Sequence, residues 1–208
     1  MKSPGSKPTI RALIAGSVAL AATVALGLLI TLRGSPFGFD DEWMRVVTDQ
    51  RSDQWLVPSL VLNFLGGGWF GTILVPVGVT VIFLLFRRPW AAGYFLVASA
   101  LSAALVQVLK GVFGRARPLD VLVNVDAGSF PSGHVTNAAT IAVVLGFILR
   151  RTWVWVAGMV YVILMALSRT YLVVHWLSDT VGGAVLGAGV GVLLWALIAR
   201  RLEVRLGV

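Results

Sequence analysis

The only two histidines of the chain lie in polar segments that interrupt a very hydrophobic sequence. His134 follows Pro131, Ser132 and Gly133, at the start of an apolar run that continues to Leu149. If a helix begins there, its first amide groups and the positive end of its dipole could bind an oxyanion. The glycine would let an oxygen approach the backbone, and His134 could exchange a proton with the bound group. The alternative is an ordinary helix start in which Ser132 only caps the first turn.

The second histidine is followed by an acid four residues later. On a helix, His175 and Asp179 would share one face, with their Cβ atoms about 5–6 Å apart. The carboxylate could hold one ring nitrogen protonated and leave the other free as a base or nucleophile. A surface ion pair at the membrane edge is the alternative. Two histidines and an aspartate could also hold zinc, but the cations between them in the sequence would repel a metal ion.

Basic residues with few acids nearby accompany the histidines. Lys110 and Arg117 lie close together in one segment, and Arg169 lies shortly before the second histidine. A single cation at a helix end often only extends its head group to the lipid–water interface. Here, glycines and a proline shape the backbone around the cations, so we expect an anion-binding site. Arg115 is expected at the rim of that site.

Composition indicates that these groups belong to a membrane protein. The chain has 208 residues, of which 58% are hydrophobic and 12% charged, and its mean hydropathy is +0.89. A soluble domain is usually about 25% charged. The absence of cysteine excludes disulfides and thiolate metal sites. We therefore expect an all-α polytopic membrane protein, with a single membrane-embedded domain over residues 1–208 that forms a six-transmembrane-helix bundle.

Six apolar blocks have about the length of a membrane-spanning helix. The expected spans cover about residues 12–32, 69–86, 89–109, 131–149, 152–168 and 180–199. The first block is longer than the core of a signal peptide and has no clear cleavage site, so we interpret it as a retained helix. Residues 40–65 are expected to be interfacial or re-entrant, or Trp55–Leu65 to be the first half of a broken second span. Trp43, Val46 and Val47 share one helical face there while the acids point elsewhere, which suits an interfacial helix.

The distribution of charge predicts the orientation of the bundle. With six spans both termini share one side, where the charges sum to +9, whereas the other side sums to −1. The first side carries Lys2, Lys7, Arg11, Arg87, Arg88, Arg150, Arg151, Arg200, Arg201, Arg205 and Glu203. The second carries Arg33, Arg45, Arg51, Lys110, Arg115, Arg117, Arg169, Asp40, Asp41, Glu42, Asp49, Asp53, Asp120, Asp126 and Asp179. Because basic loops remain cytoplasmic, we expect cytoplasmic termini and an extracytoplasmic site, and no nucleic-acid partner.

The three polar clusters also resemble a known family signature. They read K-x6-RP from Lys110 to Pro118, PSGH from Pro131 to His134, and SR-x5-H-x3-D from Ser168 to Asp179. In this order they resemble the type-2 phosphatidic acid phosphatase superfamily, the membrane lipid phosphate phosphatases. The resemblance covers about Trp55 to the C-terminus. One position departs from the pattern, because Val173 stands where members often carry glycine, two residues before His175.

The resemblance implies a metal-independent phosphatase that forms a phosphohistidine and needs no cofactor. His175, oriented by Asp179, would attack phosphorus, and His134 would protonate the leaving oxygen and later activate water. The residues expected to bind the phosphate are Lys110, Arg117, Ser132, Gly133 and Arg169. Phosphoryl transfer needs mainly positioning and charge stabilisation, which fixed cations can supply in place of a metal ion.

The membrane setting predicts a lipid phosphate as the substrate, since the site would lie at headgroup level. Candidates are phosphatidic acid, phosphatidylglycerol phosphate, diacylglycerol diphosphate and polyprenyl diphosphates. Resemblance to short bacterial members favours phosphatidylglycerol phosphate or a polyprenyl diphosphate, and a bacterial inner membrane as the location. The alternatives are an anion or lipid-phosphate transporter that uses the same cations, which gives no role to the histidines, and an inactive scaffold.

The last span contains a stripe of small residues. These are Gly182, Gly183, Gly187, Gly189 and Gly191. Small residues let helices approach closely in lipid, and we expect the stripe to pack within the chain and fix the helix that follows His175. Dimerisation through the stripe is the less favoured interpretation, so a monomer and a homodimer both stay open.

Overall fold

The computed structural model describes residues 6–206, with side chains described from Thr9 to Ile198. Within that range all regular secondary structure is helical, as predicted, and there is no β-strand. The helices are α1 (Ser6–Arg33), α2 (Gly38–Asp49), α3 (Asp53–Gly66), the π-helical turn η1 (Phe70–Leu74), α4 (Val75–Leu85), α5 (Pro89–Phe113), α6 (Gly133–Leu149), α7 (Thr152–Tyr171) and α8 (Leu177–Leu206). Of the charges used for the orientation, Lys2 and the side chains of Lys7, Arg200, Arg201, Glu203 and Arg205 lie outside the described parts.

Several helices are long and apolar enough to cross a bilayer. In the described residues, four helices qualify alone, namely α1 from Thr9, α5, α7, and α8 to Ile198. Helix α3 and the η1–α4 segment meet at a bend of 46° and qualify together as a fifth span. Helix α6 is apolar but only 17 residues long. The chain is therefore a multi-pass membrane protein with four or five candidate spans, and the expected total of six requires that α6 also crosses.

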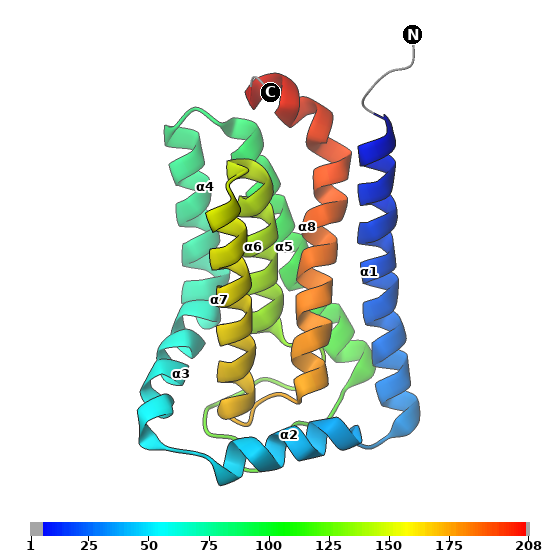
Figure 1. Cartoon of the computed structure of the whole chain (residues 1–208), viewed down its shortest axis with the longest axis vertical. Coiled ribbons are helices and arrows are strands. Elements are labelled where there is room, and N and C mark those ends of the chain that lie inside the picture. Colours follow the sequence, from blue (N-terminus) through cyan, green and yellow to red (C-terminus); the bar gives the residue numbers. More distant parts are fainter. Residues whose placement is uncertain (1–5, 207–208) are drawn as a thin grey trace.

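The long helices run side by side along the long axis of the molecule, and α2 lies across one end of them (Figure 1). The start of α1 and the C-terminal part of α8 lie at the opposite end (Figure 1). The loop between α5 and α6, residues 114–132, and the short connection between α7 and α8 are both at the α2 end. This end therefore collects all three polar clusters of the sequence.

Local sequence signals explain why the helices end where the clusters begin. Helix α5 starts with Pro89, whose missing N–H and fixed φ suit a first helical position. It stops at Gly114, which has φ +52 and terminates the helix in the left-handed conformation. Lys110 consequently lies in the last turn of α5, and Arg169 lies in the last turn of α7. Lys110 and Arg169 thus lie at helix ends on the same side of the bundle.

A cluster of apolar side chains holds α4, α5, α6 and α8 together in the half of the bundle remote from α2. Phe95 and Val144 are fully buried in it, and the Trp195 ring stacks on Phe147 with their centroids 4.8 Å apart. The Tyr94 hydroxyl donates a hydrogen bond of 2.7 Å to the carbonyl of Gly191. Burial of these side chains fixes the relative positions of the helices that carry the polar clusters.

Helices α6 and α8 pack in close backbone contact through glycines of α8. A Cβ at Gly187 would lie 2.2 Å from the carbonyl oxygen of Thr136, and one at Gly183 would lie 2.6 Å from that of Ser132. Gly189 faces Ala19 of α1 instead. The glycine stripe therefore packs within the chain, as the sequence predicts.

We predict that Gly187→Ala lowers the free energy of unfolding by about 1–3 kcal/mol, because a backbone oxygen cannot move aside as a flexible side chain can. The measurement is thermal melting of the purified protein in detergent. The matched control is Gly93→Ala in α5, where an added Cβ meets no atom within 4 Å. Equal melting temperatures for the two variants would contradict the close contact.

Candidate active site

A pocket of about 520 Å³ opens at the α2 end of the bundle, and three cations line it. Lys110 comes from α5, Arg117 from the 114–132 loop and Arg169 from α7. The side chains of Lys110 and Arg117 are nearly buried, with exposures of 7% and 10%. Burial lowers the pKa of Arg117, and the nearby carboxylates of Asp126 and Asp179 partly offset this effect. The pocket therefore gathers three positive charges, two of them on side chains that are nearly buried.

The first turn of α6 forms another wall of the pocket. Ser132 precedes the helix, and Gly133 and His134 begin it and line the pocket. The backbone N–H of Ser132 donates a hydrogen bond of 3.0 Å to the carbonyl of Asp179, which joins the starts of α6 and α8. The Ser132 hydroxyl is fully buried and has no hydrogen-bond partner. A helix start with free donors next to a cationic pocket can bind an oxyanion.

His175 lies in the connection between α7 and α8, and its two ring nitrogens face different groups. Nδ1 is 3.6 Å from Oδ2 of Asp179, which is too long for a hydrogen bond but directs this nitrogen at the carboxylate. Nε2 lies 3.5 Å from Nη1 of Arg117 and faces the pocket. These neighbours assign the proton of the neutral ring to Nδ1 and leave the lone pair of Nε2 directed at the cations.

The environment of His175 keeps its ring neutral. Complete burial lowers the pKa of His175 to about 4, although the Asp179 carboxylate acts in the opposite direction. The positive charges of Arg169 and Arg117 lower it further. The ring is therefore neutral at neutral pH, and the lone pair of Nε2 is available, as a nucleophile requires.

Arg115 does not lie at the pocket rim, contrary to our expectation. Its guanidinium is buried, and Nη1 donates to Oδ1 of Asp179 at 2.5 Å and to the Ser178 hydroxyl at 2.7 Å. Nη2 donates to Oδ2 of Asp40 at 2.8 Å. Arg115 therefore holds the carboxylate that faces His175 and does not face the pocket itself.

Asp40, the second carboxylate partner of Arg115, is not where the sequence predicted it. Trp43, Val46 and Val47 of α2 are half-buried on one face, as predicted, but Asp40 is fully buried and does not point away with the other acids. Its carboxylate accepts hydrogen bonds from the backbone N–H and the hydroxyl of Ser178, in addition to the Arg115 bond. A buried charge requires such partners, and nothing in the local pattern of α2 signals them.

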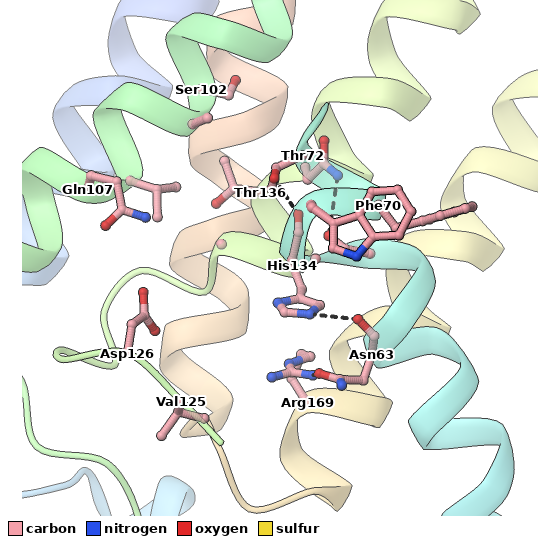
Figure 2. Close-up of a pocket in the computed structure, with 18 of the residues that line it drawn as sticks. Asn63, Phe70, Thr72, Ser102, Gln107, Val125, Asp126, His134, Thr136 and Arg169 are labelled. Atoms are coloured by element: carbon pink, nitrogen blue, oxygen red, sulfur yellow. Dashed lines mark hydrogen bonds between the residues drawn. The ribbon is translucent and has the colours of Figure 1, made fainter. Parts of the chain in front are cut away.

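Asn63 of α3 is a second site residue that the sequence did not reveal. Its backbone carbonyl lies 3.0 Å from Nε2 of His134, and its side-chain oxygen accepts a hydrogen bond of 2.5 Å from Arg169 (Figure 2). A carbonyl can only accept, so this contact assigns a proton to Nε2 of His134. Gly67 packs on the same ring, since a Cβ there would lie 2.2 Å from it. Gly66 and Gly67, which the sequence indicated only as part of a helix break, thus cover His134.

Unpaired polar atoms gather around this pocket. Among the described side chains, five buried nitrogen or oxygen atoms lack a hydrogen-bond partner, and three of them belong to residues that line the pocket, Ser99, Arg169 and His175. Buried polar groups are normally paired, so this concentration indicates room for a polar ligand. The lining is cationic, and the described residues contain no group of three or more His, Cys, Asp or Glu side chains that could hold a metal ion. The geometry suits a tetrahedral oxyanion.

Comparisons with known proteins agree with this geometry. The family model described as PAP2 superfamily matches residues 91–203, which is more than half of the chain. The undecaprenyl-diphosphatase of Sulfolobus acidocaldarius is 31% identical over 132 residues, which cover 60% of this chain and 64% of that protein. The phosphatidylglycerophosphatase B of Bacillus subtilis is 29% identical over 157 residues, which cover 71% of this chain and 70% of that protein. The chain thus spans slightly less than two thirds of the archaeal relative.

A solved structure shares the fold. The crystal structure of a transmembrane PAP2-type phosphatidylglycerolphosphate phosphatase from Bacillus subtilis superimposes with a TM-score of 0.77. The match covers 89% of this chain and 96% of that one, at 23% sequence identity. At this identity the similarity establishes a common fold over nearly the whole chain.

The unusual residue Val173 adopts a backbone conformation that favours glycine. Its φ is +58, and its side chain is almost completely buried. The left-handed region costs an L-residue about 1–2 kcal/mol, and a β-branched residue is rarely found there. The chain bears this strain two residues before His175, at the turn that aims the imidazole.

We predict that Val173→Gly is more stable than Val173→Ala. Both variants lose the buried isopropyl group, but only glycine relieves the left-handed strain. In an ordinary helix or strand the order is reversed, because glycine is less stable than alanine by about 0.5–1 kcal/mol. Thermal melting in detergent decides the order, and a higher melting temperature for the alanine variant would contradict the strain.

Proposed function

Because the chain belongs to the PAP2 superfamily, we propose that it is a membrane phosphatase that removes the terminal phosphate of a lipid phosphate or diphosphate. One observation carries the proposal: His175, His134 and the three cations Lys110, Arg117 and Arg169 line a single pocket. The names of the two relatives, an undecaprenyl-diphosphatase and a phosphatidylglycerophosphatase, support this class of substrate. The two names correspond to the two substrates that the sequence favours, a polyprenyl diphosphate and phosphatidylglycerol phosphate.

The proposed reaction begins with the lone pair of Nε2 on His175. It attacks phosphorus as the bond to the leaving oxygen breaks, which transfers the phosphoryl group to the ring. Asp179, held by Arg115, faces Nδ1 and stabilises the positive charge that develops on the imidazole. Since burial keeps the pKa of His175 at about 4, the nucleophile is available without prior deprotonation.

His134 acts on the leaving oxygen. It enters this step as the imidazolium: its Nε2–H donates to the carbonyl of Asn63, and its Nδ1–H gives the proton to the departing alkoxide or phosphate, which leaves the ring neutral. A water molecule then attacks the phosphohistidine while His134 takes its proton. The phosphorus–nitrogen bond breaks, and inorganic phosphate leaves with His175 neutral again.

Fixed positive charges stabilise the transferring group. Lys110, Arg117 and Arg169 already line the pocket, together with Gly133 at the start of α6, whereas the expected phosphate-binding residue Ser132 is buried just behind this wall. Charge stabilisation by groups that need no rearrangement is usually the largest contribution to catalysis, above all where water is excluded. These groups replace the metal ions that other phosphoryl-transfer enzymes use.

We also propose six spans, with α3–η1–α4 as one bent span and α6 as another. The charge balance of the sequence supports cytoplasmic termini, and the pocket is at the α2 end, opposite the start of α1 (Figure 1). The site would then face the extracytoplasmic side of a bacterial inner membrane. There the headgroup phosphate of a lipid can enter the pocket while its tails remain in hydrocarbon.

We predict that His175→Ala abolishes phosphate release from phosphatidylglycerol phosphate, phosphatidic acid and undecaprenyl diphosphate. His134→Ala should reduce it by about 10²–10⁴-fold, the usual contribution of a general acid. The burst of p-nitrophenol from p-nitrophenyl phosphate, which reports the first step alone, should fall much less in His134→Ala, because this leaving group needs little protonation. Phosphate release from each substrate by purified protein is the measurement, with gel filtration as the check of folding.

Two outcomes would contradict these assignments. Undiminished turnover by His175→Ala would exclude it as the nucleophile. A loss of the p-nitrophenol burst in His134→Ala as large as the loss of phosphate release from the lipids would exclude it as the general acid. Binding of the lipids by the wild type without any phosphate release would favour a transporter.

We predict that excess EDTA leaves phosphate release unchanged. The cations of the pocket supply the charge stabilisation for which other phosphatases need a metal ion. The measurement compares initial rates before and after prolonged dialysis against the chelator. A loss of activity that added divalent ions restore would show that the reaction needs a metal.

A further inference from the structure

A carboxylate already occupies part of the cationic pocket. Nζ of Lys110 donates to both carboxylate oxygens of Asp126 at 2.8 Å. Nη2 of Arg117 donates to Oδ1 of Asp126 at 2.7 Å. Asp126 lines the pocket across from His134 and Arg169 (Figure 2). Two of the three cations proposed to bind phosphate are therefore paired with an acid of the chain itself.

This acid differs from the other two near the site. Asp40 and Asp179 are fully buried in bonds to Arg115. The Asp126 side chain is 54% exposed and belongs to the irregular 114–132 loop. Burial by itself raises the pKa of Asp126, but the bonds and charges of Lys110 and Arg117 more than offset this, so its pKa lies below the usual value. The Asp126 carboxylate therefore stays ionised. Because its side chain is half-exposed, it can turn away from the two cations and keep its charge in contact with water.

The cations would remain in place if this carboxylate left. Arg117 also donates to three backbone carbonyls, those of Val174 at 2.6 Å, Gly128 at 3.0 Å and Asp126 at 3.1 Å. Lys110 is fixed by its position in the last turn of α5 and by its burial. Movement of one exposed side chain would thus open a preformed anion site.

We propose that Asp126 is an internal competitor for the phosphate site, which a substrate phosphate must displace from Lys110 and Arg117 before it can bind. The inference rests on the proposed function, because it assumes that these two cations bind the phosphate. If Asp126 is bonded to Lys110 and Arg117 in most molecules, only the remaining fraction can bind an anion. The apparent affinity of every anion is then reduced by that same fraction.

This competition sets how strongly an anion must bind in order to occupy the site. A terminal phosphate carries nearly two negative charges, whereas a phosphodiester carries one, so the terminal phosphate binds the three cations more strongly. If the affinity of both anions falls by the same factor, the dianion still binds strongly enough to occupy the site. The monoanion then binds too weakly to do so. Asp126 thereby keeps the phosphodiester headgroups of surrounding lipids from inhibiting the enzyme.

The test compares two soluble anions that differ in charge. Binding of inorganic phosphate is measured by calorimetry at about pH 8, where it is mainly a dianion. Binding of dimethyl phosphate, a monoanion, is measured by displacement of inorganic phosphate. The proteins are the wild type, Asp126→Asn and Asp126→Ala. The matched control is Asp120→Asn, an exposed acid of the same loop that does not line the pocket.

We expect both Asp126 variants to bind both anions about tenfold more tightly, by equal factors, because a half-exposed ion pair is readily broken. The control should bind like the wild type. Unchanged or weaker binding in the Asp126 variants would overturn the proposal. A larger gain for phosphate than for dimethyl phosphate would also overturn it, because a simple change in electrostatic potential scales with the charge of the ligand.

The outcomes also separate this inference from the proposed function. Calorimetry needs no turnover, and phosphate release from lipid substrates is measured on the same wild-type preparation. Normal phosphate release with no gain in the Asp126 variants would refute only the role of Asp126. Absence of phosphate release from every lipid phosphate would refute the proposed function.

Discussion

The buried network around Arg115 determines how His175 is held. One guanidinium bridges Asp40 of α2 and Asp179 of α8, and Ser178 closes the network between them. Removing one partner of a buried ion pair typically costs about 3–5 kcal/mol, because the other charge is left without compensation. Helix α2, the 114–132 loop and the start of α8 are therefore bound to one another, and Asp179 faces Nδ1 of His175 from a fixed position.

Two kinds of cation serve two different purposes at this end of the bundle. Arg115 is fully satisfied by carboxylates and supports the structure, whereas Arg169 retains an unpaired Nε and faces the pocket. Lys110 and Arg117 lie between these extremes, since the carboxylate that they share, that of Asp126, is half-exposed. Phosphoryl transfer requires charges that are in place but not already neutralised. The fold thus places a buried ionic network beside cations that are only partly paired.

Much of this architecture could be predicted from the sequence. The length and polarity of the apolar blocks predict membrane helices, because transfer into lipid depends mainly on local composition. The three motifs K-x6-RP, PSGH and SR-x5-H-x3-D, in this order, indicated the PAP2 superfamily, and the match to that family's model confirms it. The pocket indeed contains Lys110, Arg117, His134, Arg169 and His175, while their catalytic roles remain the predictions made above. Val173 was identified as unusual from its type alone, and its left-handed backbone gives the physical reason.

The sequence by itself thus determined the helices, the helix ends at which polar residues gather, and the types of group available for chemistry. Only the tertiary structure decided which of those groups are paired. Asp40 contacts Arg115 from 75 residues away, and Asn63 contacts His134 from 71 residues away. Pairing of this kind depends on which helix ends meet and on which charges lose access to water. Hydropathy and motif spacing describe neighbours along the chain, so they cannot distinguish a buried Asp40 from an exposed Asp126.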